Sequence, residues 1–185
     1  MRFLLSILFC CFTLVLSQAQ SAKPEPATPQ AAATSARLAG AWQLVSVETI
    51  RPNGEVIYPY YGKHPEGLLI YDRSGWMSVQ IVSDPKPVIP NGDSRAAIFA
   101  ATPEQKASAL EGYYAYFGTW TVDPSGATVT HHLRQSLYPG ERGEDFVRQL
   151  SFDGNRLTLI AKAHEMGEDH QRRLTWERVG TQPAK

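Results

Sequence analysis

The sequence predicts an all-β fold, an eight-stranded antiparallel up-and-down barrel with one lateral α-helix. After residue 38 the chain alternates short runs rich in β-branched and aromatic residues with turn sequences, the pattern of a sandwich or barrel. The turn sequences at 72–75, 123–126 and 153–155 are short enough to join neighbouring antiparallel strands. A single stretch has helical spacing instead. A closed barrel is preferred to a sandwich because closure leaves no exposed strand edge.

The predicted strands share an alternation of apolar and polar residues. They cover residues 41–50, 66–72, 76–82, 116–123, 128–136, 146–152, 156–161 and 171–179, with a further short strand at 55–58. In a barrel of this strand number, the interior is either filled by side chains or holds one small ligand.

The helix begins after Thr102. A threonine N-cap followed by Pro103 at the first helical position is a typical helix start. Ala107, Leu110 and Tyr114 then recur at helical spacing, which predicts a helix that ends near Tyr116. The proline-rich residues before it, 80–101, predict a long irregular connection. Long loops in compact domains are often functional, so we expect residues 83–101 to gate the barrel interior.

The N-terminus predicts a signal peptide over residues 1–19. Arg2 precedes an apolar run at 3–16, and Ser17 and Ala19 are small residues at the cleavage positions. As a helix the run would span about 21 Å, short of the roughly 30 Å hydrocarbon core, so no stable membrane anchor is expected. The predicted location is therefore periplasmic or secreted.

The segment that follows, residues 20–37, is rich in alanine and proline and predicts an extended linker. The barrel domain is expected over residues 38–180. Both cysteines, Cys10 and Cys11, lie in the signal peptide, so the mature chain would contain no disulfide and no cysteine ligand.

The charge balance excludes some classes of partner. The chain has 18 basic and 18 acidic residues and no block of like charge, so nucleic-acid binding is not expected. Phosphate-binding glycine loops and the serine-hydrolase motif are missing from the sequence, and no cofactor is predicted. No metal site is predicted either. His131 and His132 are adjacent in a strand and point to opposite faces, and the residues 164–170 are expected to form a solvated polar loop.

Alternation predicts which side chains face the barrel interior. The inward set is mainly apolar: Trp42, Leu44, Ser46, Leu68, Ile70, Met77, Val79, Ile81, Tyr116, Gly118, Trp120, Val122, Val129, His131, Leu133, Phe146, Arg148, Leu150, Phe152, Leu157, Leu159, Arg172, Leu174, Trp176 and Arg178. An unpaired buried cation is costly, so the inward Arg148, Arg172 and His131 need partners. They are either paired or solvated at the barrel ends, or they hold the polar head of a ligand.

A structural pair is predicted at the barrel floor. The first and last strands of a closed barrel are neighbours, which places Arg178 beside Trp42. We expect the guanidinium to lie over the indole as a cation over a π-face.

Several sequence blocks together resemble the lipocalin-like domain family of calycin barrels over about residues 38–179. They are LAGAWQLVSVE from residue 38, VIYPYYG from 56, GLLIYDRSGWMSVQI from 67, EGYYAYFGTWTVD from 111, THHLRQSLYP from 130 and RRLTWERV from 172. The resemblance implies an eight-stranded barrel around an apolar cavity but no catalytic set, and it carries over only the floor pair of Trp42 and Arg178. The chain departs from the family at residues 140–143, GERG, where a tryptophan-containing loop is expected.

The prediction that follows is a protein that binds a small hydrophobic or amphipathic molecule inside the barrel. His131 and Arg148 would anchor its polar head. The remaining predicted ligand-binding residues form the wall: Met77, Val79, Tyr116, Trp120, Leu133 and Phe146. The oligomeric state is left open.

Two other functions remain open from the sequence. One is a cofactor-free isomerase- or cyclase-like enzyme with His131 as acid–base beside Tyr116. The other is a structural or protein-binding envelope module whose interior is filled. The aromatic group Tyr58, Tyr60 and Tyr61 is expected near the mouth, as loop packing, a lid or a docking patch.

Overall fold

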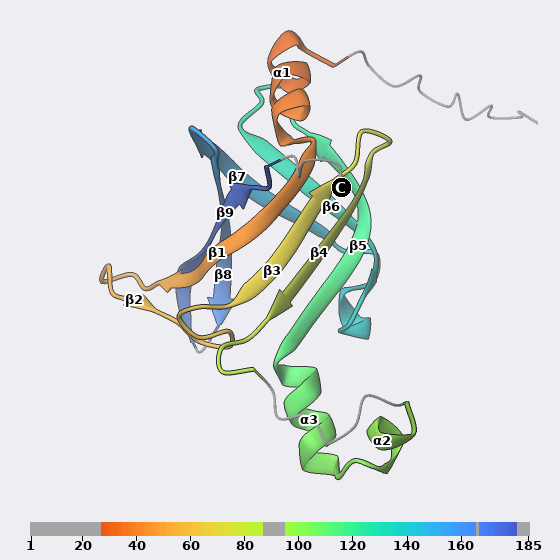
Figure 1. Cartoon of the computed structure of the whole chain (residues 1–185). Coiled ribbons are helices and arrows are strands. Elements are labelled where there is room, and N and C mark those ends of the chain that lie inside the picture. Colours follow the sequence, from red (N-terminus) through yellow and green to blue (C-terminus); the bar gives the residue numbers. More distant parts are fainter. Residues whose placement is uncertain (1–26, 87–94, 166, 181–185) are drawn as a thin grey trace, which may run out of the picture.

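One antiparallel sheet closes on itself to form the barrel (Figure 1). The computed structural model describes residues 27–86, 95–165 and 167–180. Strands β3 to β9 pair in chain order, and β1 pairs with both β3 and β9. The predicted closed eight-stranded barrel is therefore confirmed, with the short strand β2 added at the outer end of β1.

The elements have the following bounds. The strands are β1 Gly40–Ile50, β2 Val56–Ile57, β3 Glu66–Tyr71, β4 Trp76–Val82, β5 Tyr113–Val122, β6 Thr128–Ser136, β7 Asp145–Asp153, β8 Arg156–Glu165 and β9 Glu168–Arg178. The helices are α1 Pro29–Leu38, α2 Arg95–Ala100 and α3 Pro103–Glu111, with a 3-10 turn η1 at Pro139–Glu141. Helix α1 lies at one end of the barrel and α3 at the other (Figure 1). We call these ends the floor and the mouth.

The predicted extended linker is wrong over its described part. Helix α1 occupies Pro29–Leu38, with Thr28 as its N-cap and Pro29 in the first turn. The alanine-rich sequence that resembled a linker also has high helix propensity, and docking against the barrel decides the outcome. The Thr34 hydroxyl donates to the carbonyl of Gly126 at 3.2 Å, and Leu38 is fully buried. Residues 20–26 and the predicted signal peptide lie outside the described residues.

The helix after Thr102 is confirmed at its start and corrected at its end. Thr102 and Gln105 form a reciprocal capping box. The helix ends at Glu111 instead of near Tyr116, because the tyrosines from Tyr113 onward belong to β5. The predicted irregular connection before it contains the short helix α2, and its residues 87–94 lie outside the described residues.

The last hairpin is longer than predicted. Strand β8 continues to Glu165 and β9 begins at Glu168, so the residues expected to form a polar loop pair across this hairpin. His164 pairs with Asp169 across the hairpin, for example, and Nδ1 of His164 lies 2.7 Å from Oδ1 of Asp169.

The inward faces of two strands also differ from the prediction. In β3, Leu69 and Tyr71 are buried, whereas the predicted Leu68 and Ile70 are not. All four residues are apolar or aromatic, so alternation alone does not identify the inward face, and pairing with β4 decides it. In β1 an irregularity next to Leu44 shifts the later residues, so that Val47 and Thr49 face inward in place of Ser46.

Candidate functional site

The barrel contains a cavity of about 530 Å³ that extends from its centre to the mouth. Its apolar wall includes Val79, Ile81, Phe146 and Leu159, which come from β4, β7 and β8. Its polar lining includes Tyr116, His131, Glu141, Arg148, Glu165 and Arg172, which come from strands β5 to β9 and from the 3-10 turn η1. A cavity of this size is typical of small-molecule sites.

The cavity brings together five of the residues that the sequence singled out as ligand-binding. Val79, Tyr116, His131, Phe146 and Arg148 all line it.

The other three predicted ligand-binding residues lie elsewhere in the barrel. Met77 and Leu133 are buried in the core but do not line the cavity. Trp120 packs on Tyr71 at a centroid distance of 5.0 Å, and its indole N–H donates to the carbonyl of Asp72. Met77 and Trp120 lie close to the 72–75 turn, toward the floor of the barrel.

The centre of the barrel contains a hydrogen-bonded chain of three rings. The hydroxyl of Tyr71 lies 2.6 Å from Nε2 of His131, and the hydroxyl of Tyr116 lies 2.8 Å from Nδ1. All three side chains are buried. Burial lowers the pKa of His131 well below its ordinary value, and the nearby charge of Arg148 adds to this effect. His131 is therefore neutral at physiological pH. Sequence alternation missed Tyr71 because it assigned the wrong face of β3 to the interior.

Arg148 is a cation near this chain of rings. Its guanidinium lies 5.1 Å from the ring centroid of Phe146. Burial raises the pKa of Tyr116, and the nearby charge of Arg148 opposes that rise. None of the ion pairs formed by the described residues includes Arg148. It therefore stands at the cavity wall without a carboxylate partner.

Charged side chains at the mouth are bonded to one another or to hydroxyl groups. Arg172 contacts Glu165 at 2.6 Å and lies over the ring of Tyr60, whose hydroxyl donates to the same carboxylate. Glu141 accepts from the hydroxyls of Tyr114 and Ser136 at 2.8 and 2.5 Å. The departure from the family pattern at 140–143 thus supplies a rim carboxylate through η1.

The loop that carries Tyr58, Tyr60 and Tyr61 packs over the edge of the barrel mouth, which we call the rim. Tyr61 is buried and contacts Tyr114 at a centroid distance of 6.4 Å, and Tyr60 contacts Tyr61. The ring of Tyr58 lies beneath the ammonium of Lys63. This arrangement matches the loop-packing expectation.

The residues proposed as the gate do not line the cavity in the part of the connection that the structure describes. The cavity wall includes neither the described residues 83–86 nor any residue of α2. The segment 87–94 falls outside the described residues, so the gating prediction stays a prediction.

His132, the neighbour of His131 in β6, makes its contacts outside the cavity. His132 points away from His131 and bonds Asp145 at 2.7 Å and Thr121 at 2.8 Å, as expected for adjacent strand residues. Within the described ranges, His, Cys, Asp and Glu side chains form no group of three or more suited to hold a metal ion.

The predicted floor pair is present. The guanidinium of Arg178 lies 4.1 Å from the ring centroid of Trp42 and donates to the carbonyls of Ala39, at 3.1 Å, and Arg37. The indole N–H of Trp42 donates to the carbonyl of Leu38 at 2.8 Å. These bonds tie α1 to both end strands of the barrel and close the floor.

The closed eight-stranded antiparallel barrel with one cavity reaching its mouth places the protein in the calycin class. Residues 39–179 match a family described as the lipocalin-like domain, and the chain belongs to this family. No curated protein matches the chain. In the described part of the chain, no helix is both long enough and apolar enough to cross a bilayer.

Proposed function

We propose that the protein binds a small amphipathic molecule in the barrel cavity, with an acidic head at Arg148. The observation that carries the proposal is the Arg148 guanidinium, which lies at the cavity wall beside Phe146 and has no carboxylate partner among the described residues. An arginine in such a place gains from a bound carboxylate, which supplies charge and hydrogen-bond acceptors together. The apolar wall of Val79, Ile81, Phe146 and Leu159 would hold the tail.

The proposal includes export. The apolar run at 3–16 and the small residues before residue 20 support a cleaved signal peptide. The N-terminal sequence of protein recovered from its own cells tests this part, since cleavage after Ala19 would leave Gln20 as the first residue.

Two alternatives have less support. An enzyme with His131 as acid–base would need a free ring nitrogen, but both nitrogens are bonded to tyrosine hydroxyls. Turnover that requires His131 would favour that alternative. A structural module would have a filled interior, whereas this barrel contains a cavity of about 530 Å³.

The test compares dodecanoic acid with its methyl ester by calorimetric titration. Wild-type protein should bind the acid about tenfold more tightly, and Arg148→Ala should remove this preference, which corresponds to about 1.4 kcal/mol. Arg134→Ala is the matched control, because Arg134 is an exposed arginine on the neighbouring strand β6. Equal affinity of the wild type for acid and ester would contradict an acidic head at Arg148.

A second measurement needs no chosen ligand. Native mass spectrometry of protein purified from the compartment where it accumulates should show a bound small molecule of discrete mass. The bound mass should disappear on denaturation.

A further inference from the structure

The positions of the protons in the hydrogen-bonded chain Tyr71–His131–Tyr116 determine which chemical groups the cavity can bind. A neutral imidazole has one N–H donor and one acceptor nitrogen. Of the two tyrosines bonded to His131, one must therefore donate to the ring and the other must accept from it. The second tyrosine keeps its own hydroxyl proton for another partner.

The surroundings of Tyr71 determine the direction. Its side chain is 1% exposed, and Nε2 of His131, at 2.6 Å, is the hydrogen-bond acceptor that the described residues offer its hydroxyl. If Nε2 carried the proton, the Tyr71 proton would be buried without an acceptor, which is costly. Tyr71 therefore donates to Nε2, and the ring proton is on Nδ1.

The consequence falls on Tyr116. Nδ1–H donates to the Tyr116 oxygen at 2.8 Å, and the nearby Arg148 guanidinium has only donors to offer. The oxygen of Tyr116 thus accepts from His131, and its own proton has no acceptor in either neighbour. Because Tyr116 lines the cavity, that proton is available to a bound molecule.

A third donor lines the same cavity. The indole N–H of Trp176 is buried in the wall and has no hydrogen-bond partner among the described residues. The rim carboxylates of Glu141 and Glu165 are already bonded to hydroxyls or to arginine. The inner cavity therefore presents donors, and its acceptors lie at the mouth.

We propose that the Tyr116 hydroxyl and the Arg148 guanidinium form a two-donor site for an acceptor oxygen of the ligand, a carbonyl or carboxylate oxygen. Tyr71 and His131 are positioning residues that direct the Tyr116 proton into the cavity. This inference rests on the proposed function and narrows its ligand class, because a head with donors alone, such as an alkylammonium, is excluded.

The first test is nitrogen NMR of ligand-free protein with labelled histidine. The expected result is a neutral His131 with the proton on Nδ1, and Tyr71→Phe should reduce the Nδ1-protonated fraction because the donor to Nε2 is gone. A wild-type ring protonated on Nε2 would overturn the inference. This measurement does not depend on ligand binding.

The second test uses a dimethylaminonaphthyl ethyl ketone, a fluorescent probe whose emission shifts to the red when its carbonyl accepts a hydrogen bond. The red shift should be present in wild type, lost in Tyr116→Phe and reduced in Tyr71→Phe, although Tyr71 does not line the cavity. Tyr114→Phe is the matched control and should retain the shift, because its hydroxyl bonds Glu141. Affinity for the ketone should fall roughly tenfold in Tyr116→Phe.

The outcomes separate the two proposals. Probe binding with the same emission in wild type and Tyr116→Phe would overturn the donor site and leave the cavity function standing. Failure of the ketone, dodecanoic acid and its methyl ester to bind wild-type protein would overturn the cavity function and the inference built on it. Dodecylamine that binds as tightly as dodecanoic acid would also overturn the donor site.

Discussion

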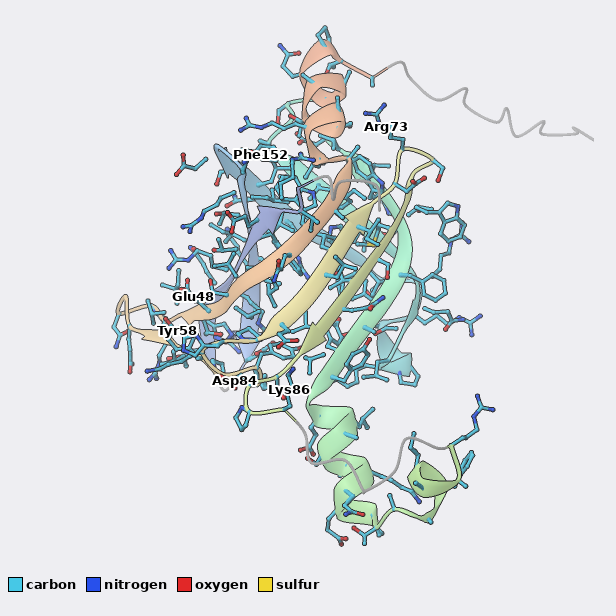
Figure 2. All side chains as sticks on the ribbon, viewed as in Figure 1. Glu48, Tyr58, Arg73, Asp84, Lys86 and Phe152 are labelled. Atoms are coloured by element: carbon cyan, nitrogen blue, oxygen red, sulfur yellow. The ribbon has the colours of Figure 1, made fainter. Side chains whose placement is uncertain are left out.

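The floor and the mouth of the barrel satisfy their polar groups in different ways. At the floor, Arg178 and the indole of Trp42 donate to backbone carbonyls beneath helix α1, and Phe152 packs beside them (Figure 2). At the mouth, Nε of Arg172 lacks a hydrogen-bond partner within the described residues, and the buried His170 has only Glu165 near it, 3.5 Å from Nε2. The floor is thus built for stability. The mouth retains a donor at Arg172 that a ligand or solvent can bind.

The backbone at the floor is adapted to this closure. Gly40 has φ of +135°, and a Cβ atom there would lie 2.8 Å from Nη1 of Arg178. Another residue would be strained at this φ and would require the guanidinium to shift from the place where it bonds the carbonyls at the end of α1. Substitutions at the floor should therefore change stability, whereas substitutions at the mouth and cavity should change binding.

The largest effect is expected for Trp42→Ala at the floor. Trp42 is 1% exposed and contacts both Arg178 and Phe152. Its removal should lower the free energy of unfolding by about 3–5 kcal/mol in urea denaturation. Trp76→Ala is the control, because Trp76 is half-exposed, and should cost less than about 1 kcal/mol. Equal losses for the two variants would contradict the stabilising role of the floor.

A smaller loss is expected for Arg178→Leu. The variant keeps apolar cover on Trp42 but removes the donors to the carbonyls of Ala39 and Arg37. The free energy of unfolding should fall by about 2 kcal/mol, measured by urea denaturation. Arg178→Lys should lose less stability than Arg178→Leu, because a lysine keeps the charge. It should still be less stable than wild type, because a lysine lacks the planar fork of the guanidinium. A variant as stable as wild type would show that the carbonyls are satisfied without Arg178.

An acid-dependent effect is expected at the β5–β6 turn of the floor. Bonds from the Ser125 hydroxyl and the Thr128 amide lower the pKa of Asp123 from 3.8 to about 2. A carboxyl with a lowered folded pKa stabilises above its unfolded pKa, and this contribution is lost as pH falls from about 5 toward 2. Because the turn is solvated, we expect Asp123→Asn to cost only about 1 kcal/mol at neutral pH.

The pH profile provides the check on this prediction. Thermal unfolding of Asp123→Asn should be less sensitive to pH than that of wild type between pH 5 and 2. Parallel profiles for the two proteins would show that Asp123 contributes nothing to the acid sensitivity.

The smallest stability effect is expected at the mouth. Glu165→Gln weakens the contacts with Arg172 and Tyr60 at a half-exposed site, which should cost about 0.5 kcal/mol. The variant also frees the charge of Arg172 at the cavity wall, so affinity for dodecanoic acid should rise slightly in calorimetric titration. A loss of stability as large as that of Arg178→Leu would remove the distinction between floor and mouth.

Features set by local chemistry or by barrel closure were accessible from the sequence at both ends. At the floor, tight-turn sequences and the neighbouring positions of the first and last strands predicted the hairpins and the pair of Trp42 and Arg178, and at the mouth the Thr102 cap predicted the start of α3. These features depend on local chemistry or on closure, and both can be recognised from the order of residues.

The cavity was only partly accessible. Alternation placed His131 and Arg148 inside because polar residues interrupt an otherwise apolar face. It failed in β3, where Leu68, Leu69, Ile70 and Tyr71 are all apolar or aromatic, and so missed the tyrosine bonded to Nε2 of His131. Composition likewise failed to distinguish an extended linker from helix α1, whose position depends on docking with two turns of the barrel.

The sequence by itself determined the all-β class, the approximate positions of the strands and the presence of a few polar residues among apolar ones. Tertiary structure decided which face of β3 is inward, where β1 is irregular and which side chains bond His131. The physical reason is that strand register and hydrogen-bond partners are properties of pairs of strands. The strands that carry Tyr71 and His131 are separated by two others in the sheet, and no pattern within one segment connects them.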